Sequence, residues 1–399
     1  MSQQSRPPAL PTALPEEIGL SSARLGRLTQ VMRDEVARGR VPGAVALISR
    51  RGKIGYFESC GQRDPVKGTP MTQDTIFRIY SMTKPIVTVA AMMLFEEGRF
   101  LLNDPVSTYL PELGNLQVAV PRSDQIDLVP PTRPVTIQDL LRHTSGLTYE
   151  FRGNSPVHKM YMAAKVSRFD MTSAEHVALL GQLPLLHQPG TRWEYGRSTD
   201  VIGRLIEVLS GSTLSTHLDE QILRPLGMVD TAFHAPQAHH TRLAEAFAQD
   251  PQTGAAVRLM DVRSPPQFES GGAGLVSTAT DYARFLQMLQ NGGALDDVRL
   301  LSRKTIEFMT ADHLGSITGP SDLLPPGYGF GLGFAVRLHA GIAPVPGSIG
   351  QYFWGGLAGT TFWVDPAEQL FAILLTQAPG QRDYYRMLFR DMVYAAFAD

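Results

Sequence analysis

Apolar residues recur at helical spacing near both ends of this 399-residue chain. Their spacing predicts a helix over Ser21–Ala37, with Ser21-Ser22 as a possible N-terminal cap, and another over Tyr384–Ala396. Between these helices, short apolar runs bounded by turn residues predict strands at Gly43–Ser49, Lys53–Phe57, Phe330–Val336, Thr360–Val364 and Leu370–Leu375. Short hairpins are only marginally stable alone. We therefore expect one antiparallel sheet, built from both ends of the chain and covered by the first and last helices.

The middle of the chain has mostly helical and loop patterns. Helices are predicted at Ile86–Glu97, Ile137–Leu141, Ala174–Leu180, Thr199–Leu209, Leu214–Ile222 and Thr280–Gln290. This order predicts an α+β fold in which a mainly helical lobe, about 81–290, is inserted into an α/β lobe of about 18–80 and 291–399. The Pro-rich residues 1–17 are expected to form a flexible arm, so that 18–396 make a single two-lobed unit.

The bulk composition is that of a globular protein and argues against several partners. A hydrophobic content of 43%, a charged content of 19% and a net charge of −2 give no reason to expect nucleic acid or an anionic membrane. No apolar run is long enough to span a bilayer, and Met1–Glu17 lacks the apolar segment of a signal peptide. We therefore expect a cytoplasmic protein. The composition predicts no particular oligomeric state.

A serine and a lysine lie three residues apart, just where the apolar helix Ile86–Glu97 begins. Residues at this spacing share a helix face, so the Lys84 ammonium group can reach the Ser81 hydroxyl. A serine becomes a good nucleophile when an adjacent base takes its proton, and a lysine can be that base if burial lowers its pKa. Pro85 fits a first helical turn, which places the Ser81 N–H among the unpaired donors that favour an oxyanion. The pattern is typical of serine acylation without histidine.

Two later segments carry groups suited to the same chemistry. After a turn at Pro189-Gly190, Tyr195 is either a packed corner residue or a proton carrier between the serine, the lysine and the leaving group. In Trp354-Gly355-Gly356 the glycines allow the backbone to approach a ligand closely or to form a bulge. A strand N–H from this segment could supply a second oxyanion donor.

Ser81-x-x-Lys84, Tyr195 after the Pro-Gly turn, and Trp354-Gly355-Gly356 resemble, in this order, the motifs of family VIII carboxylesterases. These are serine esterases with the fold of class C β-lactamases and DD-peptidases, and the resemblance covers about residues 18–396. The stretches Leu140–Leu147 and Ser270–Thr278 are also similar to that superfamily. The resemblance implies a β-lactamase/DD-peptidase-like fold, with an antiparallel sheet, terminal helices and an inserted helical lobe.

The resemblance also implies roles for the matching residues. Ser81 would be the acylated nucleophile, and Lys84 and Tyr195 would act together as base and proton relay. Which of these two holds the proton at each step stays open. The backbone N–H groups of Ser81 and Leu357 would form the oxyanion hole.

Two departures from the β-lactamase pattern favour ester substrates. Trp354-Gly355-Gly356 replaces Lys-Thr-Gly, so that Trp354, with Gly355 and Gly356, would form an apolar pocket wall without the cation that helps hold a β-lactam carboxylate. Tyr195 is followed by Gly196-Arg197 instead of a small residue and Asn or Ser. Arg197 either binds a substrate carboxylate or lies on the solvated surface. Both departures argue against strong β-lactamase activity and leave room for a weak side reaction.

Two other conspicuous patterns are expected to be structural. His143 lies near Ser145, but nothing identifies a third group to orient a Ser-His pair. The glycine run Gly271–Gly274 lacks the Lys-Ser/Thr of a phosphate loop, so a structural join beside the cleft is the simpler interpretation. His239-His240 are adjacent and no His-Glu-x-x-His motif exists, so neither a metal site nor a cofactor is expected.

The leading hypothesis is a carboxylesterase that cleaves small or short-acyl esters through an acyl-enzyme on Ser81. The alternative is a β-lactamase, DD-peptidase or acyltransferase on the same fold. A non-catalytic binding module is a third hypothesis, and the intact Ser81, Lys84 and Tyr195 argue against it. The expected partner is a small-molecule ester.

Overall fold

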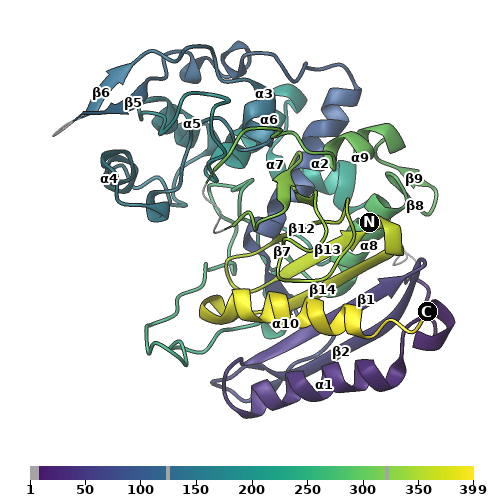
Figure 1. The fold of residues 1–399 in the computed structure, drawn as a ribbon. Coiled ribbons are helices and arrows are strands. Elements are labelled where there is room, and N and C mark those ends of the chain that lie inside the picture. Colours follow the sequence, from purple (N-terminus) through teal and green to yellow (C-terminus); the bar gives the residue numbers. More distant parts are fainter. Residues whose placement is uncertain (1–8, 123–125, 320–322) are drawn as a thin grey trace.

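One eight-stranded antiparallel sheet, made from both ends of the chain, forms the base of the molecule (Figure 1). The structure is a computed structural model that describes residues 9–122, 126–319 and 323–399. The strand order is β10-β11-β12-β13-β14-β1-β2-β3. These strands are β1 (Gly43–Arg50), β2 (Lys53–Asp64), β3 (Thr69–Pro70), β10 (Tyr328–Phe330), β11 (Ala335–Arg337), β12 (Tyr352–Gly355), β13 (Thr361–Asp365) and β14 (Leu370–Thr376).

Shorter strand pairs and helices complete the described residues. The pairs are β4 (Phe77–Arg78) with β7 (Val276–Ser277), β5 (Val118–Pro121) with β6 (Ile126–Val129), and β8 (Ala294–Leu295) with β9 (Val298–Arg299). The helices are α1 (Ser22–Ala37), α2 (Thr83–Glu96), α3 (Ile137–Leu141), α4 (Pro156–Ala163), α5 (Ser173–Gly181), α6 (Ser198–Ser210), α7 (Leu214–Leu218), α8 (Ala279–Gln290), α9 (Arg303–Met309) and α10 (Arg382–Ala395). Within the described ranges, no helix has the length and apolar character needed to cross a membrane.

The helices predicted at the two ends of the chain are confirmed, and they pack side by side on one face of the sheet (Figure 1). The Ser21 side chain caps α1 by accepting a hydrogen bond from the Arg24 N–H. On α10, Tyr385, Phe389 and Val393 are buried at intervals of four residues, which places them on one helical face. The expected sheet with terminal helices is therefore present.

Alternation along the central strands gives the sheet a second buried face. On β1, Ala46 and Ile48 belong to the core under α1 and α10, whereas Val45 and Leu47 belong to the core on the opposite side. On that opposite side, α8 contacts β14 and β1, and α2 contacts α6. The expected division assigned α8 to the helical lobe, but α8 packs against the sheet.

The structure differs from the predicted pattern in two segments. Phe330–Val336 was expected to be one strand, but β10 and β11 form a hairpin around a turn in which Gly333 has a φ of 85°. A residue other than glycine would be strained there, so the glycines interrupt the apolar run. Within residues 1–17, expected as a flexible arm, Leu10 is buried and the Pro11 carbonyl accepts a hydrogen bond from the Ile54 N–H. The part of this segment from residue 9 onward therefore packs against β2.

Candidate active site

Ser81 lies in a single turn of 3₁₀ helix, Tyr80–Met82, that runs directly into α2. Pro85 stands in the first turn of α2, so the helix begins close to Ser81 as predicted. Tyr80 has a φ of 44°, a left-handed conformation that is rare for a bulky side chain. Its phenol accepts a hydrogen bond from the Met260 N–H at 2.9 Å. This distant contact helps to hold the turn that carries Ser81.

Lys84 connects the serine to two other parts of the chain. Its Nζ lies 3.4 Å from the Ser81 Oγ, 3.0 Å from the Tyr149 Oη and 2.7 Å from the Gly272 carbonyl oxygen. The side chain is buried, and these contacts use the three donors of the ammonium group. The contact with Ser81 is the longest of the three, as is common for catalytic pairs before substrate binds.

The groups around Lys84 keep it protonated. Burial alone lowers the pKa of the ammonium group, but Tyr149, Tyr195 and the Asp200 carboxylate outweigh burial and raise the pKa above its ordinary value. Burial raises the pKa of the Tyr149 phenol to about 12, although the Lys84 cation opposes this rise. The condition under which a buried lysine acts alone as the base is therefore not met, and Lys84 rests as a cation.

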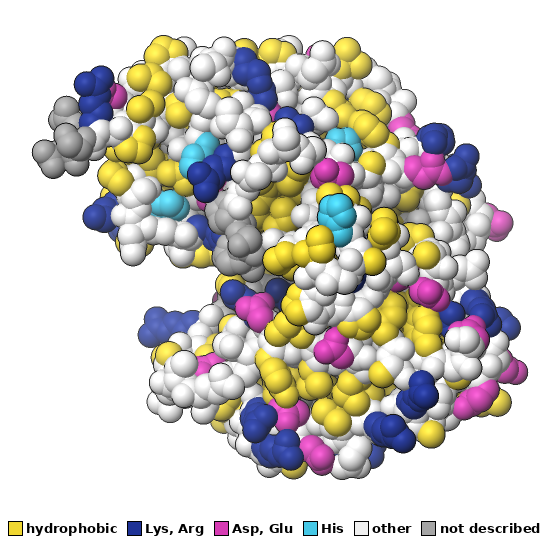
Figure 2. Space-filling model, viewed as in Figure 1, with side chains coloured by type: hydrophobic (Ala, Val, Ile, Leu, Met, Phe, Trp, Pro, Cys, Tyr) yellow, Lys and Arg dark blue, Asp and Glu magenta, His cyan; other side chains and the backbone are white. Residues whose placement is uncertain are grey.

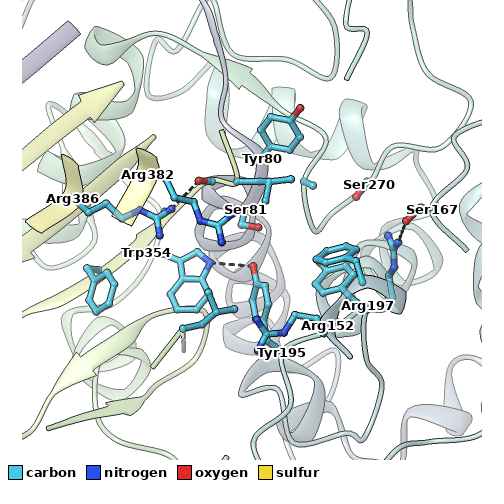
Figure 3. A pocket seen from close by; sticks show the side chains of 18 of the residues that line it. Tyr80, Ser81, Arg152, Ser167, Tyr195, Arg197, Ser270, Trp354, Arg382 and Arg386 are labelled. Carbon is cyan, nitrogen blue, oxygen red and sulfur yellow. Dashed lines mark hydrogen bonds between the residues drawn. The ribbon is translucent and has the colours of Figure 1, made fainter. Parts of the chain in front are cut away.

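Tyr195 reaches the site from the loop that precedes α6. The centre of its ring lies 4.6 Å from the Lys84 Nζ, and its Oη accepts a hydrogen bond from the Trp354 Nε1 at 3.3 Å (Figure 3). The Pro-Gly turn predicted before it is present, with Gly190 at a φ of 77°. The structure thus brings Tyr195 and Trp354, which lie more than 100 residues further along the chain, next to Ser81 and Lys84.

Tyr149 is a functional candidate that the sequence analysis missed. Its Oη is the partner of Lys84, and its ring lies 5.5 Å from that of Tyr195 and stacks on Phe151 at 5.0 Å. A signal was available, because Tyr149 comes two residues after the Leu140–Leu147 stretch that had been singled out. Tyr149 and Tyr195 therefore pack against each other, and both rings lie close to the lysine cation.

Asp200 is the buried carboxylate whose negative charge helps to raise the pKa of Lys84. Its Oδ1 accepts hydrogen bonds from the Ser270 Oγ at 2.6 Å and from the Gly272 N–H at 2.9 Å. The same Gly272 offers its carbonyl oxygen to Lys84. A Cβ atom on Gly271 would lie 2.6 Å from the Thr199 carbonyl oxygen, so only glycine allows this close approach. The glycine run is a structural join, and it fixes the position of the lysine.

Arg197 is buried, so its interpretation as a solvated surface residue is wrong. Its Nη2 lies 3.1 Å from a Glu150 oxygen, and its Nη1 lies 3.6 Å from the Asp200 Oδ2. The guanidinium group packs over the Tyr149 ring, 4.7 Å from its centre. Arg197 lines the cavity, but two carboxylates already balance its charge.

The Trp-Gly-Gly segment closes the site from the edge of the sheet. Trp354 is buried, and its ring packs 5.2 Å from that of Tyr195 and 5.3 Å from that of Phe330. A Cβ atom on Gly356 would collide with the Ile79 carbonyl oxygen, two residues before Ser81. The glycine therefore lets this strand end approach the turn that carries Ser81.

One cavity of about 220 Å³ joins these elements. Ser81, Tyr149, Tyr195, Trp354 and Leu357 all line it, and other aromatic and aliphatic side chains make up much of the remaining wall. In the space-filling view, the surface is hollowed on the left, between the helical part and the sheet (Figure 2). Neither the Ser81 N–H nor the Leu357 N–H has a hydrogen-bond acceptor among the described residues, which suits the expected oxyanion donors.

His143 is enclosed by the site without contacting Ser145. Its ring is buried 4.8 Å from that of Tyr195, and burial with the nearby Lys84 charge holds its pKa well below the usual range. Ser145 instead shares a 2.8 Å hydrogen bond with Ser198. Neither residue forms a Ser-His pair. Within the described residues, no three His, Cys, Asp or Glu side chains gather as a metal site requires.

Comparison with known proteins identifies the family. The profile named Beta-lactamase matches residues 28–396. This chain belongs to the beta-lactamase family. Esterase EstB of Burkholderia gladioli is 33% identical over 405 residues, which cover 96% of this chain and 98% of EstB. Protein Rv1367c of Mycobacterium tuberculosis is 35% identical over 356 residues, which cover 87% of this chain and 88% of that protein.

The solved structure of EstCE1, described as a hydrolase with promiscuous acyltransferase activity, has the same fold. It matches with a TM-score of 0.78 and 27% identity, and the match covers 93% of this chain and 98% of EstCE1. The β-lactamase-like α+β fold and the resemblance to family VIII esterases are thereby confirmed. The protein is a serine hydrolase of the beta-lactamase family.

Proposed function

We propose that this serine hydrolase is a carboxylesterase that cleaves small or short-acyl esters through an acyl-enzyme on Ser81. The observation that carries the proposal is the position of the Lys84 ammonium group, in contact with the Ser81 hydroxyl and close to two phenols. The small cavity with Trp354 in its wall favours a small acyl group. The named esterase among the relatives supports the same activity.

Formation of the acyl-enzyme needs a base for the serine proton. Because Lys84 rests as a cation, the cation stabilises a nearby phenolate, and Tyr195 is the better candidate for the first proton acceptor. As the Ser81 Oγ attacks the ester carbonyl carbon, the Ser81 and Leu357 N–H groups would stabilise the oxyanion. The tetrahedral intermediate then expels the alcohol, which receives the proton from Tyr195, and the acyl group remains on Ser81.

Hydrolysis of the acyl-enzyme repeats these steps with water. Tyr195 takes a proton from the attacking water, the same N–H groups stabilise the second oxyanion, and the proton returns to the Ser81 Oγ as the carboxylic acid leaves. Lys84 stays protonated throughout, in hydrogen-bond range of the Gly272 carbonyl and the Tyr149 Oη. In this scheme the lysine stabilises charge and Tyr195 transfers protons.

The test compares wild type with Ser81→Ala on a panel of p-nitrophenyl esters of increasing acyl length. Ser167→Ala is the matched control, because Ser167 lines the same cavity and has no hydrogen bond to Lys84. We expect Ser81→Ala to abolish turnover and a phosphonate ester to label the Ser81 peptide in mass spectrometry. Unchanged hydrolysis by Ser81→Ala would sink the proposal.

Acyl transfer to an alcohol is a second candidate, since the description of EstCE1 includes this activity. It predicts that added alcohol diverts the acyl group from water, which the ratio of ester to acid products measures. Trp354 replaces the lysine of the β-lactamase pattern, but Arg382 and Arg386 also line the cavity, so β-lactam hydrolysis has to be tested directly. Turnover of a chromogenic cephalosporin much faster than any ester would replace the esterase proposal by a β-lactamase.

A further inference from the structure

Arg386, on α10, contacts the Trp-Gly-Gly segment where it lines the cavity (Figure 3). Its Nη2 donates a hydrogen bond to the Gly356 carbonyl oxygen at 2.7 Å. This carbonyl belongs to the same peptide group as the Leu357 N–H, the expected second oxyanion donor. A trans peptide group is planar, so its C=O and N–H point in opposite directions. Arg386 therefore holds one end of the peptide group whose other end carries the donor.

Gly355 provides the space for this contact. A Cβ atom on Gly355 would lie 2.6 Å from the Arg386 Nη2 and 2.8 Å from its Cζ, too close for any other residue without moving the arginine. Gly356 is needed for a different reason, because a Cβ atom there would collide with the Ile79 carbonyl oxygen, just before Ser81. The Gly356 N–H donates to the Thr360 carbonyl oxygen at 2.8 Å, which fixes the preceding peptide group. The two glycines of the motif thus serve two separate contacts.

The Arg386 guanidinium group has little competition for its charge. Its Nη1 lies 3.4 Å from an oxygen of Asp383, a side chain that is 71% exposed, and its Nε has no hydrogen-bond partner among the described residues. Burial lowers the pKa of Arg386 to about 10, which still leaves it positively charged at neutral pH. A charged donor on a carbonyl oxygen makes a stronger bond than a neutral one and polarises the peptide group.

We propose that Arg386 is a positioning residue of the oxyanion hole. Its bond to the Gly356 carbonyl orients and polarises the peptide group whose N–H, at Leu357, stabilises the oxyanion. This inference rests on the proposed function. Because Arg386 acts on the backbone and the oxyanion exists only near the transition state, its loss is expected to lower kcat more than to raise KM.

The test uses Arg386→Met, Arg386→Lys and a control on the same helix, Met387→Ala. Met387 follows Arg386 directly, its side chain is exposed, and it does not line the cavity. In Arg386→Met, kcat for p-nitrophenyl acetate should fall by about tenfold to a hundredfold, less than the hundredfold to thousandfold typical of losing a donor outright. KM should change by less than about threefold, since the ground state does not use the oxyanion hole. The kcat of Arg386→Lys should lie between those of Arg386→Met and wild type, and Met387→Ala should retain the wild-type kcat.

Two further experiments separate positioning from a general structural effect. Methylguanidinium added to Arg386→Ala should restore part of the lost kcat, whereas the same salt should leave Ser81→Ala inactive. Gly355→Ala displaces the guanidinium group and should lower kcat in the same way. Combined with Arg386→Met, it should lower kcat little further, because both changes break one contact.

The outcomes distinguish this inference from the proposed function. If Ser81→Ala still hydrolyses esters, the proposed function is wrong. If Ser81 is required but Arg386→Met keeps the wild-type kcat, or Met387→Ala loses as much, only the role of Arg386 is overturned. Thermal melts show which variants are folded. If Arg386→Met does not fold, Arg386→Lys and Gly355→Ala decide the question by the same kcat criterion.

Discussion

The two faces of the large sheet are both buried, yet they bury different kinds of groups. Under α1 and α10, the outer core consists mainly of apolar side chains, such as Leu28, Trp363 and Phe389. On the opposite face, past the apolar core that contains Val45 and Leu47, the charged side chains of Lys84 and Asp200 are buried. Apolar packing depends mostly on volume and area, whereas buried charges need specific partners. The outer core therefore contributes mainly to stability, whereas the buried charged cluster costs stability and holds residues of the proposed mechanism.

The two faces also differ in the solvent exposure of the groups that pair with a buried carboxylate. In the outer core, Glu35 accepts a hydrogen bond from the buried Tyr385 Oη, but its charged partners, Arg38 and Arg40, have side chains that are 59% and 47% exposed. Asp200, at the site, has buried partners, including Arg197 and the Ser270 hydroxyl. Water screens the exposed arginines beside Glu35 but not the buried Arg197 beside Asp200. The negative charge of Asp200 therefore acts on Lys84 with little screening. The following changes test this contrast.

The largest expected effect comes from Lys84→Met. This substitution keeps the approximate length of the side chain and removes the positive charge beside the Tyr195 ring. We expect kcat for p-nitrophenyl esters to fall by about a thousandfold, as when a general acid–base pair is lost. Urea unfolding should still show a cooperative transition, because Asp200 keeps Arg197 as a partner. A kcat above a tenth of the wild-type value would contradict the assigned role.

Phe389→Ala should have the opposite effect, a loss of stability without a loss of kcat. Phe389 is fully buried and packs against Trp363 at 5.4 Å, so its removal leaves a cavity in the outer core. We expect unfolding to cost about 3–5 kcal/mol less, with kcat unchanged while the protein is folded. Met387→Ala, at an exposed position of the same helix, is the control and should stay within about 0.5 kcal/mol of wild type. A large loss of kcat in Phe389→Ala would contradict the conclusion that the outer core affects stability without affecting catalysis.

His176, buried in α5 and stacked on Phe268 at 4.3 Å, should make the helical part sensitive to acid. Burial lowers the pKa of His176 to about 4. Between that value and about 6.5, the pKa of an unfolded histidine, the unfolded state binds more protons, so acid favours unfolding. We expect this residue to remove about 2 kcal/mol of stability between pH 7 and pH 5, measured by urea unfolding. His176→Gln should flatten that dependence, and an unchanged slope would refute the assignment.

The smallest of these effects should come from Tyr149→Phe. The change removes one acceptor of the Lys84 ammonium group and keeps the ring. A hydrogen bond to a charged group contributes on the order of 1.5 kcal/mol, so kcat should fall by about tenfold. Tyr195→Phe should lose about a hundredfold or more if Tyr195 transfers the proton. A greater loss in Tyr149→Phe than in Tyr195→Phe would exchange the two assignments.

Regular patterns predicted the regular parts of the fold. The apolar spacing of α1 and α10 and the runs of β1, β13 and β14 led to the correct sheet with its terminal helices, because one-sided burial leaves a periodic pattern. The pattern did not predict α4 or α9, which are short and mixed in character. It also merged β10 and β11, where the turn is made by glycines inside an apolar run.

Some residues of the candidate site could likewise be identified from the sequence, whereas others could not. Ser81 and Lys84 were found because their contact is local, set by helical spacing. Tyr195 and Trp354 stood out in turn and glycine patterns, the resemblance to a family suggested their roles, and the structure brings them to the same cavity. Tyr149 and Arg386 were not singled out. Their contacts join positions 65 and 30 residues apart in sequence, so no spacing rule marks them.

By itself, the sequence determined the helix that begins beside Ser81, the glycines near the oxyanion donor and the sheet built from both chain ends. These features follow from local steric rules and from the periodicity of burial. Only the tertiary structure decided the charge state of Lys84, because its pKa depends on Tyr149, Tyr195 and Asp200. A pKa is set by every charge and dipole within a few ångströms, whatever its place in the chain. The sequence thus pointed to Ser81 as the candidate nucleophile, and the fold determined the charges and hydrogen bonds around it.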